Sequence, residues 1–357
     1  MKKIVKYSFV LLLISTNIFT VFSQIGGNSV YNSLDLTNSP RVTAMGGSFL
    51  SINDDDINLS VSNPSLISNK MNNNLSLNFV DMYSDINYGF ASYSKTFKKL
   101  GSFVTTMQFV NYGKFTAADE TGLVTGTFSA ADYSFDIGWG RTLSQHFTIG
   151  SNIKFIYSKL ETYSSLGLAV DVAGTYHNKK NNFSASLIFK NIGRQITAYV
   201  PGNTEPVPFE IQAGLSKKME HVPFRLSLLF THLEKWDLTY NDPLHPENTV
   251  NMLTGAVDKK SGFDKFTDKA LRHIVVGGEF SPAKNFFIRL GYNYKRRKEM
   301  QVVAKPGTVG FSWGVGIKIS KFSINYARSA YYAAGSPNYI GITTCLSDFI
   351  KKTKTIN

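Results

Sequence analysis

The chain has 357 residues, of which 43% are apolar, 13% aromatic and 18% charged, with a formal net charge of +13 and one cysteine. This length suits one large domain or two ordinary ones, and the lack of an apolar run of about 18 residues excludes a helical membrane protein. The lone Cys345 excludes a disulfide scaffold, and without zinc-finger spacing or a compact basic domain we expect no nucleic-acid partner for the positive charge.

Residues 1–23 have the pattern of a secretory signal peptide. A start with three lysines precedes an apolar stretch at 9–14, and Val21 and Ser23 supply the small residues of a cleavage site before Gln24. A membrane anchor is the alternative, but polar residues at 15–17 interrupt the apolar stretch too early. The sequence therefore predicts Sec-dependent export.

Residues 24–74 lack strand periodicity and contain a short predicted helix. Ser39 can cap this helix and Pro40 suits its first turn, with Arg41 next in the chain. Gly46 or Gly47 then ends the helix.

Two further motifs lie in the same segment. Asp54, Asp55 and Asp56 could bind calcium through their oxygens, but EF-hand spacing is absent, so we expect a hydrogen-bonding turn and no metal. Asn63 and Pro64 predict a structural turn, since Pro fixes φ and the Asn side chain can bond the local backbone.

From about residue 75 the hydrophobic pattern has a period of two residues, which is typical of β-strands. Between residues 309 and 320, for example, large apolar side chains alternate with Gly, Ser and Lys. Fourteen segments share this alternation. They lie near 75–82, 87–97, 101–113, 130–142, 146–160, 163–177, 182–192, 207–218, 222–235, 272–281, 285–296, 307–320, 321–333 and 337–347.

The even number and the length of these segments indicate an outer-membrane barrel, whose strands need about 9–11 residues to cross a bilayer. A soluble sandwich is the alternative. Its solvent face would carry many Lys and Glu, whereas the polar positions here are mostly Gly, Ser, Thr and Asn. We therefore predict an all-β fold, a 14-stranded antiparallel transmembrane β-barrel over residues 75–348, with a periplasmic tail at 349–357.

A ring of fourteen strands is wider than the eight-stranded kind that side chains alone can fill. Left empty, such a barrel would leak. We therefore expect residues 24–74 to fold into the lumen as an N-terminal hatch.

Predicted connections are short after even-numbered strands and long after odd-numbered ones. Because outer-membrane barrels keep short turns in the periplasm, both termini are expected there and the long 236–271 connection is expected at the cell surface. That connection carries an unusual apolar load, including Trp236, Tyr240, Phe263 and Phe266. We interpret these residues as a partner-binding loop; a lid folded over the barrel mouth is the alternative.

A basic run, Lys295, Arg296, Arg297 and Lys298, opens another outward connection. It could be the solvated base of a loop. Clustered guanidinium groups also bind phosphates, so contact with lipopolysaccharide or an acidic partner is the second interpretation.

Motifs for catalysis are missing from the sequence. Neither a G-x-S-x-G elbow nor an H-E-x-x-H helix is present, so we expect no enzyme and no cofactor. The sequence alone does not exclude a catalytic Ser–His pair assembled across two strands. Cys345, late in the last predicted strand, is interpreted as a small packed side chain.

Four motifs carry a resemblance to a known family: RVTAMGG at 41–47, DDD at 54–56, NPSL at 63–66 and DINYG at 85–89. Together they resemble the PorV/PorQ family of the type IX secretion system, and the second and fourth favour its PorQ branch. That family is similar to the FadL fatty-acid channels, fourteen-stranded barrels with an N-terminal hatch. The rest of the chain matches only in strand number and order.

The resemblance implies a non-enzymatic anchor in the outer membrane. PorQ-like proteins hold a PorZ-like surface protein beside the PorU–PorV pair, in an assembly that attaches cargo to lipopolysaccharide. The alternative function is a FadL-like channel for hydrophobic compounds, which needs a lateral gap in the barrel wall and a ligand pocket beside the hatch.

Overall fold

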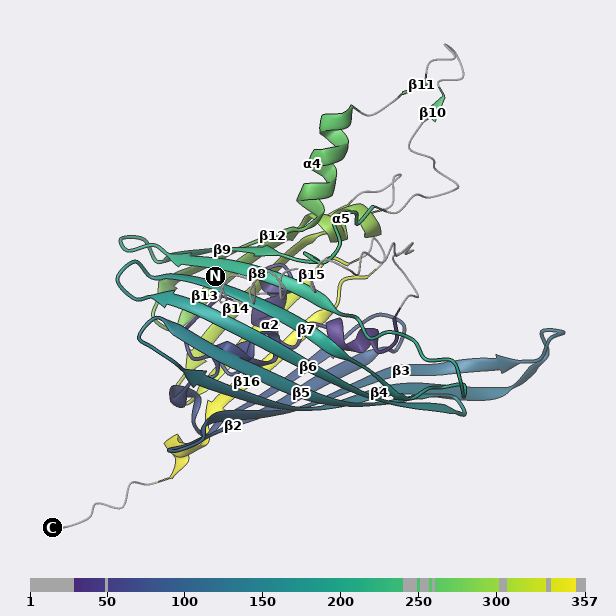
Figure 1. The fold of residues 1–357 in the computed structure, drawn as a ribbon, viewed down its shortest axis with the longest axis horizontal. Coiled ribbons are helices and arrows are strands. Elements are labelled where there is room, and N and C mark those ends of the chain that lie inside the picture. Colours follow the sequence, from purple (N-terminus) through teal and green to yellow (C-terminus); the bar gives the residue numbers. More distant parts are fainter. Residues whose placement is uncertain are drawn as a thin grey trace, which may run out of the picture.

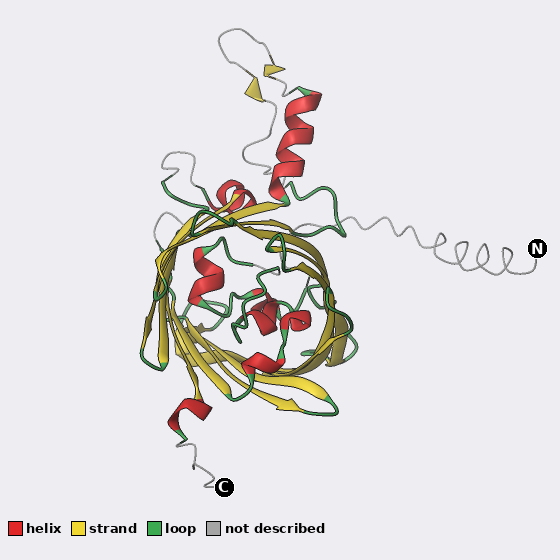
Figure 2. Ribbon diagram, turned by 90° about the vertical axis from the view of Figure 1, so that its left-hand side faces the viewer, coloured by secondary structure: helices red, strands yellow, loops and turns green. Residues whose placement is uncertain are grey.

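The computed structural model describes residues 29–48, 51–239, 249–250, 257–258, 261–301, 307–331 and 335–350. The expected signal peptide, Tyr240 and most of the expected tail lie outside these residues. Fourteen of the described strands close into one antiparallel barrel, which Figure 2 shows as a ring. They are β1 (Asn74–Asp81), β2 (Asn87–Phe97), β3 (Gly101–Ala118), β4 (Val124–Thr142), β5 (Phe147–Leu160), β6 (Tyr163–Asn178), β7 (Phe183–Thr197), β8 (Glu210–Lys218), β9 (Phe224–Phe230), β12 (Ile274–Ala283), β13 (Phe286–Asn293), β14 (Phe311–Ile319), β15 (Phe322–Ser329) and β16 (Asn338–Cys345).

The barrel closes where β1 pairs with β16, from Asn74 opposite Cys345 to Asp81 opposite Asn338. Closure leaves no exposed sheet edge, which is the condition for a β-structure to sit in lipid. The predicted fold class is confirmed, and each of the fourteen predicted strands matches one observed strand.

Side chains alternate between lumen and lipid along each strand, because successive residues of a strand point to opposite faces. In β4, Ser134 and Asp136 are buried inside while Tyr133, Phe135 and Ile137 are exposed outside. The alternating sequence pattern thus reflects the two environments of each strand, the packed polar lumen on one face and the bilayer on the other.

The structure corrects two predicted boundaries. The expected loop at 114–129 is mostly strand, because β3 and β4 stay paired up to Ala118 and Val124, with Phe115 stacked on Phe128 at 5.2 Å between ring centroids. This hairpin extends well beyond the neighbouring strands (Figure 1).

At the other boundary, β13 ends at Asn293 rather than near residue 296. Its chain continues as the helix α5 (Tyr294–Met300), whose first turn is capped by the Asn293 side chain accepting from Arg296 N. The long 236–271 connection also contains a helix, α4 (Gly262–Arg272), besides the two-stranded sheet of β10 (Thr249–Val250) and β11 (Val257–Asp258). No helix in the described part of the chain is long and apolar enough to cross a membrane.

The described N-terminal residues, 29–48 and 51–73, lie inside the ring (Figure 2), and we name them the plug. It consists of short helices: η1 (Asn32–Asp35), α2 (Pro40–Ala44), α3 (Leu59–Ser62), η2 (Pro64–Leu66) and η3 (Asn69–Met71). The predicted helix after Ser39 is confirmed as α2, with Ser39 Oγ accepting from Val42 N at 3.3 Å.

The plug packs on inward-facing apolar side chains of the barrel. Val42, Met45 and Leu59 share one buried cluster with Ile188 of β7 and Leu229 of β9. Glycines on the strands make room for this approach, since a Cβ at Gly291 would collide with the backbone of Gly46 and one at Gly150 with that of Pro64. The lumen therefore has a shape matched to this segment.

Candidate functional site

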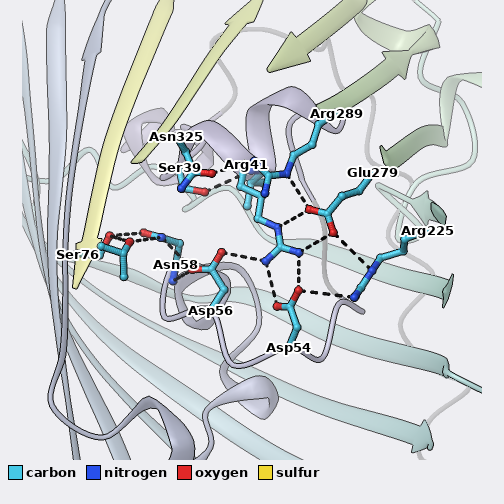
Figure 3. A network of polar contacts seen from close by, with 12 residues as sticks. Ser39, Arg41, Asp54, Asp56, Asn58, Ser76, Arg225, Glu279, Arg289 and Asn325 are labelled. Carbon is cyan, nitrogen blue, oxygen red and sulfur yellow. Dashed lines mark hydrogen bonds and ion pairs between the residues drawn. The ribbon is translucent and has the colours of Figure 1, made fainter. Parts of the chain in front are cut away.

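A buried arginine lies at the centre of the plug. Arg41 donates from Nε and Nη2 to the two oxygens of Glu279 on β12, at 3.1 and 3.0 Å. It also donates from Nη1 to Asp54 at 3.0 Å and to Asp56 at 3.1 Å (Figure 3). One guanidinium thus joins two parts of the plug to the barrel wall.

Two barrel arginines complete this cluster. Arg289 Nε donates to Glu279 at 2.7 Å, and Arg225 lies 3.7 Å from both Glu279 and Asp54. Three arginines therefore balance three carboxylates, and we name Arg41, Asp54, Asp56, Arg225, Glu279 and Arg289 the arginine network (Figure 3). Burial by itself raises the pKa of the Asp54 carboxyl, but the charge and hydrogen bonds of Arg41 outweigh burial and hold that pKa below its ordinary value.

The three consecutive aspartates of the predicted turn have different binding partners. Asp54 and Asp56 bind Arg41, whereas Asp55 accepts from Ser68 Oγ at 2.7 Å and from Lys70 Nζ at 3.0 Å. Within the described ranges, no three His, Cys, Asp or Glu residues are grouped as a metal would require. The arrangement is that of a charged, hydrogen-bonded turn.

The Asn63–Pro64 motif closes another turn of the plug. Asn63 Oδ1 accepts from Ser65 N at 3.0 Å, and Asn63 Nδ2 donates to Thr175 of β6 at 3.2 Å. Gly46 and Gly47 have positive φ values of 108° and 109°, a conformation that favours glycine, where the chain leaves α2 beside β13. These motif residues all fix the plug against the wall.

Two cavities lie at opposite ends of the plug. The outer cavity, about 590 Å³, opens at the end with the long connections and is lined by Lys190, Glu210, Arg296 and residues 206–209, among others. The inner cavity, about 440 Å³, opens at the end with the short turns and is lined by the arginine network together with Lys218, Lys318 and Lys321. The plug separates the two.

The wall beside the outer cavity is interrupted. β7 pairs with β8 only from Phe183 to Lys190, although β7 itself continues to Thr197 along β6. Residues 205–209 precede β8 and lie opposite this unpaired end of β7, and we name the boundary between 191–197 and 205–209 the β7–β8 seam. Its recorded bonds use side chains: Asn191 Nδ2 donates to Pro208 O at 2.9 Å, and Gln195 Oε1 accepts from Glu205 N at 2.7 Å.

The predicted surface residues lie at the outer rim. Trp236, Phe263 and Phe266 are 54%, 77% and 58% exposed, and Trp236 contacts Phe266 at 5.6 Å between ring centroids. α4 points away from the ring, so the described part of this connection is not a lid over the mouth (Figure 2).

The predicted basic run lies on α5 rather than at a loop base. Lys295 Nζ is 2.8 Å from His232 Nε2, and Arg296 donates to Ser329 Oγ at 2.7 Å. Arg297 donates to Gly307 O at 2.8 Å, and Lys298 lies 3.6 Å from Asp268. Lys295 and Arg296 line the outer cavity.

Sequence reasoning missed the barrel half of the arginine network, namely Arg225, Glu279 and Arg289. A signal was present, because a charged residue at an inward strand position is seldom buried unless it is paired, and Glu279 and Arg289 stand at such positions. It also missed the β7–β8 seam, because the predicted strand at 207–218 includes Val207 and Pro208, whereas β8 begins only at Glu210.

A Ser–His contact across strands does occur: His177 Nδ1 lies 2.8 Å from Ser184 Oγ. The other recorded partners of this pair, within the described residues, include no carboxylate that could orient the imidazole, and neither cavity is lined by the pair. The contact fits a polar pair of the lumen wall.

These features define the class of protein. A closed ring of fourteen antiparallel strands, apolar outside and polar inside, with its N-terminal segment in the lumen, is an integral barrel of the outer membrane.

Comparison with solved structures gives the particular fold. The chain is similar to the Pseudomonas putida toluene transporter TodX, with 12% identity, a TM-score of 0.50 and coverage of 87% of this chain and 97% of that one. A TodX monoaromatic hydrocarbon channel mutant aligns with 12% identity, a TM-score of 0.51 and coverage of 85% and 97%. A Pseudomonas aeruginosa FadL homologue aligns at 10% identity, a TM-score of 0.47 and coverage of 87% and 98%. No family model matches the chain, and no curated protein does. The two TodX comparisons thus show that the chain has a TodX-like fold.

Proposed function

We propose that the chain is an outer-membrane channel for hydrophobic compounds, which leave the outer cavity sideways through the β7–β8 seam. The barrel with which the chain shares its fold is described as a toluene transporter. A lumen closed by a plug offers a poor route for an apolar solute. A lateral exit would instead deliver the solute to the acyl chains of the bilayer, where its free energy is lower than in water.

The observation that supports this proposal is the seam itself. Seven residues of β7, 191–197, extend beyond the last pair with β8 at Lys190. The residues opposite them, 206–209, also line the outer cavity, and Phe209 is 43% exposed. Opening here breaks a few side-chain bonds, each worth about 0.5–1.5 kcal/mol, rather than a ladder of backbone bonds.

A reversible lock across the seam tests the route. Cysteines at Gln195 and Glu205, in a Cys345→Ser background, should cross-link the seam on oxidation and stop uptake of radiolabelled toluene by cells that carry the barrel. Reduction should restore uptake. Uptake at the unlocked rate through a fully cross-linked seam would overturn the proposed route.

A matched lock controls for cross-linking as such. Ala185 and Leu215 face each other within the paired part of β7 and β8. Cysteines at these two positions should cross-link without any loss of uptake, because this stretch does not open.

The plug has a separate proposed role, closure of the lumen to ions and water. Its support is the arginine network, which ties α2 and the Asp54–Asp56 turn to β9, β12 and β13. Removing residues 24–74 should raise the conductance of the purified barrel in planar bilayers.

Anchoring of a PorZ-like surface protein in type IX secretion, beside PorU and PorV, is the second candidate function. The motif resemblance of residues 41–89 supports it, as does the β3–β4 hairpin that projects beyond the rim (Figure 1). Leu123 and Val124 at its tip are 68% and 64% exposed. Shortening this hairpin should release the partner into the medium while barrel levels stay normal; a partner that remains cell-bound would argue against docking there.

The basic residues of α5 carry a related proposal. Arg297 and Lys298 lie on a helix beyond the barrel rim, where lipopolysaccharide phosphates are within reach of a guanidinium or ammonium group. Their replacement by Gln should weaken retention of the barrel on immobilised lipopolysaccharide.

A further inference from the structure

Helix α4 has two chemically distinct sides. Ser261 caps its start by accepting from Asp264 N at 3.1 Å. Phe263, Phe266 and Ala270 recur at intervals of three and four residues and so share one side, which we name the apolar stripe. The opposite side carries the charged stripe of Asp264, Asp268 and Arg272.

The charged stripe is occupied by contacts within the chain. Asp268 accepts from Tyr294 Oη at 2.7 Å and lies 3.6 Å from Lys298, both on α5. Arg272 donates to Leu238 O at 3.4 Å. The apolar stripe has Trp236 against Phe266, and Phe263 is 77% exposed.

The direction of α4 relates these stripes to the membrane. Figures 1 and 2 agree that α4 runs outward from the rim, across the barrel axis rather than along it. A helix in this direction lies roughly parallel to the bilayer in which the barrel sits. Figure 1 also shows α5 beside the Arg272 end of α4, on the side that faces away from the bilayer. The charged stripe, which contacts α5, therefore faces away from the bilayer, and the apolar stripe faces towards it.

The foot of α4 is also at the depth of the membrane surface. Only His273 separates Arg272, the last residue of α4, from β12, and Val276 of that strand is an exposed, lipid-facing side chain. At a rise of about 3.3 Å per strand residue, the helix ends within about 14 Å of the lipid-facing wall. The apolar stripe is thus continuous with a surface that lipid already covers.

We propose that α4, together with Trp236, is an in-plane anchor that buries its apolar stripe in the outer leaflet. Amphipathic helices of this pattern insert their apolar side at the boundary between headgroups and acyl chains. Such an anchor would fix the orientation of the barrel in the membrane independently of what the lumen transports.

Quenching of Trp236 fluorescence by brominated acyl chains tests the anchor. The full barrel, carrying Trp139→Phe and Trp313→Phe so that Trp236 alone reports, is placed in nanodiscs of plain or brominated phosphatidylcholine. Because an interfacial helix sits about 5–10 Å into the headgroup–acyl boundary, bromination should reduce Trp236 emission at least roughly twofold. Equal emission in both lipids would overturn the proposal.

Two variants sharpen the result. Replacing Phe263 and Phe266 by Ser should abolish most of the quenching, while Lys265→Ser, on the charged side of the same helix, should leave it unchanged. Heat-modifiable gel mobility reports whether each variant still forms the barrel, and the quenching of the parent protein stands as a test if a variant does not.

The alternative occupant of the apolar stripe is a protein partner, which is the interpretation made from the sequence. It would show Trp236 open to acrylamide and unquenched in brominated nanodiscs, but shielded from acrylamide in native outer membranes. That pair of results would assign the stripe to a protein and overturn the lipid anchor.

Discussion

Two arginines of similar burial hold two different parts of the molecule. Arg41 of the plug and Arg272 of α4 have side chains only 8% and 11% exposed, and both pair with carboxylates. Arg41 reaches Asp54, 13 residues away, and Glu279, 238 residues away. Arg272 pairs with Asp268, four residues earlier on the same helix.

The difference lies in what each arginine joins. Arg41 connects separate segments within a packed lumen, so its loss would leave buried charges without compensation at the contact between plug and wall. Arg272 mostly stabilises the helix to which it already belongs, and the chain holds its partner close in any case. Burial alone therefore does not rank these two sites; the sequence separation of the partners does.

Replacing Arg41 by Met is expected to have the largest effect. Removal of one partner from a buried ion pair costs about 3–5 kcal/mol, because Asp54, Asp56 and Glu279 lose their shared donor. The plug should leave its seat, and ion conductance in planar bilayers should rise. Wild-type conductance in this variant would show that other contacts are sufficient to hold the plug.

Gly291→Ala should have an intermediate effect. The new Cβ would collide with the backbone of Gly46 and Met45 in the plug, and overpacking of this kind costs about 1–3 kcal/mol. Gly174→Ala is the matched control, because a Cβ at that position meets nothing within 4 Å. The thermal transition of the heat-modifiable form should fall for the first variant only; equal transitions would contradict a tight lumen.

Acid should weaken the plug through the same network. Because the pKa of Asp54 is held below its ordinary value of 3.8, Asp54 stabilises the seated plug fully above about pH 4 and loses this effect as pH falls through the lowered pKa. Conductance should stay constant from pH 8 to pH 5 and rise only in stronger acid. A rise between pH 8 and pH 5 would point to a different titrating group.

Arg272→Ala should have the smallest effect. A helix pair of this spacing contributes about 0.3–0.5 kcal/mol, so hydrogen exchange of the α4 amides should quicken slightly while conductance and the thermal transition of the barrel stay as they are. A leak in this variant would mean that the rim and the plug are coupled, against the comparison drawn above.

The sequence by itself determined the barrel. Alternation of apolar and polar residues, read across fourteen segments, fixes which side chains face lipid, and the strand number and order followed from it. The cap at Ser39 and the turn at Asn63 were equally local, since their partners lie two or three residues away.

Only the tertiary structure decided where the charges meet. Nothing in the spacing of Arg41 and Glu279 indicates that they pair, because their contact depends on how the plug is seated within the closed ring. The β7–β8 seam and the direction of α4 are of the same kind. Each depends on where an element ends relative to its neighbours in space, and neither hydrophobic period nor turn chemistry contains that information.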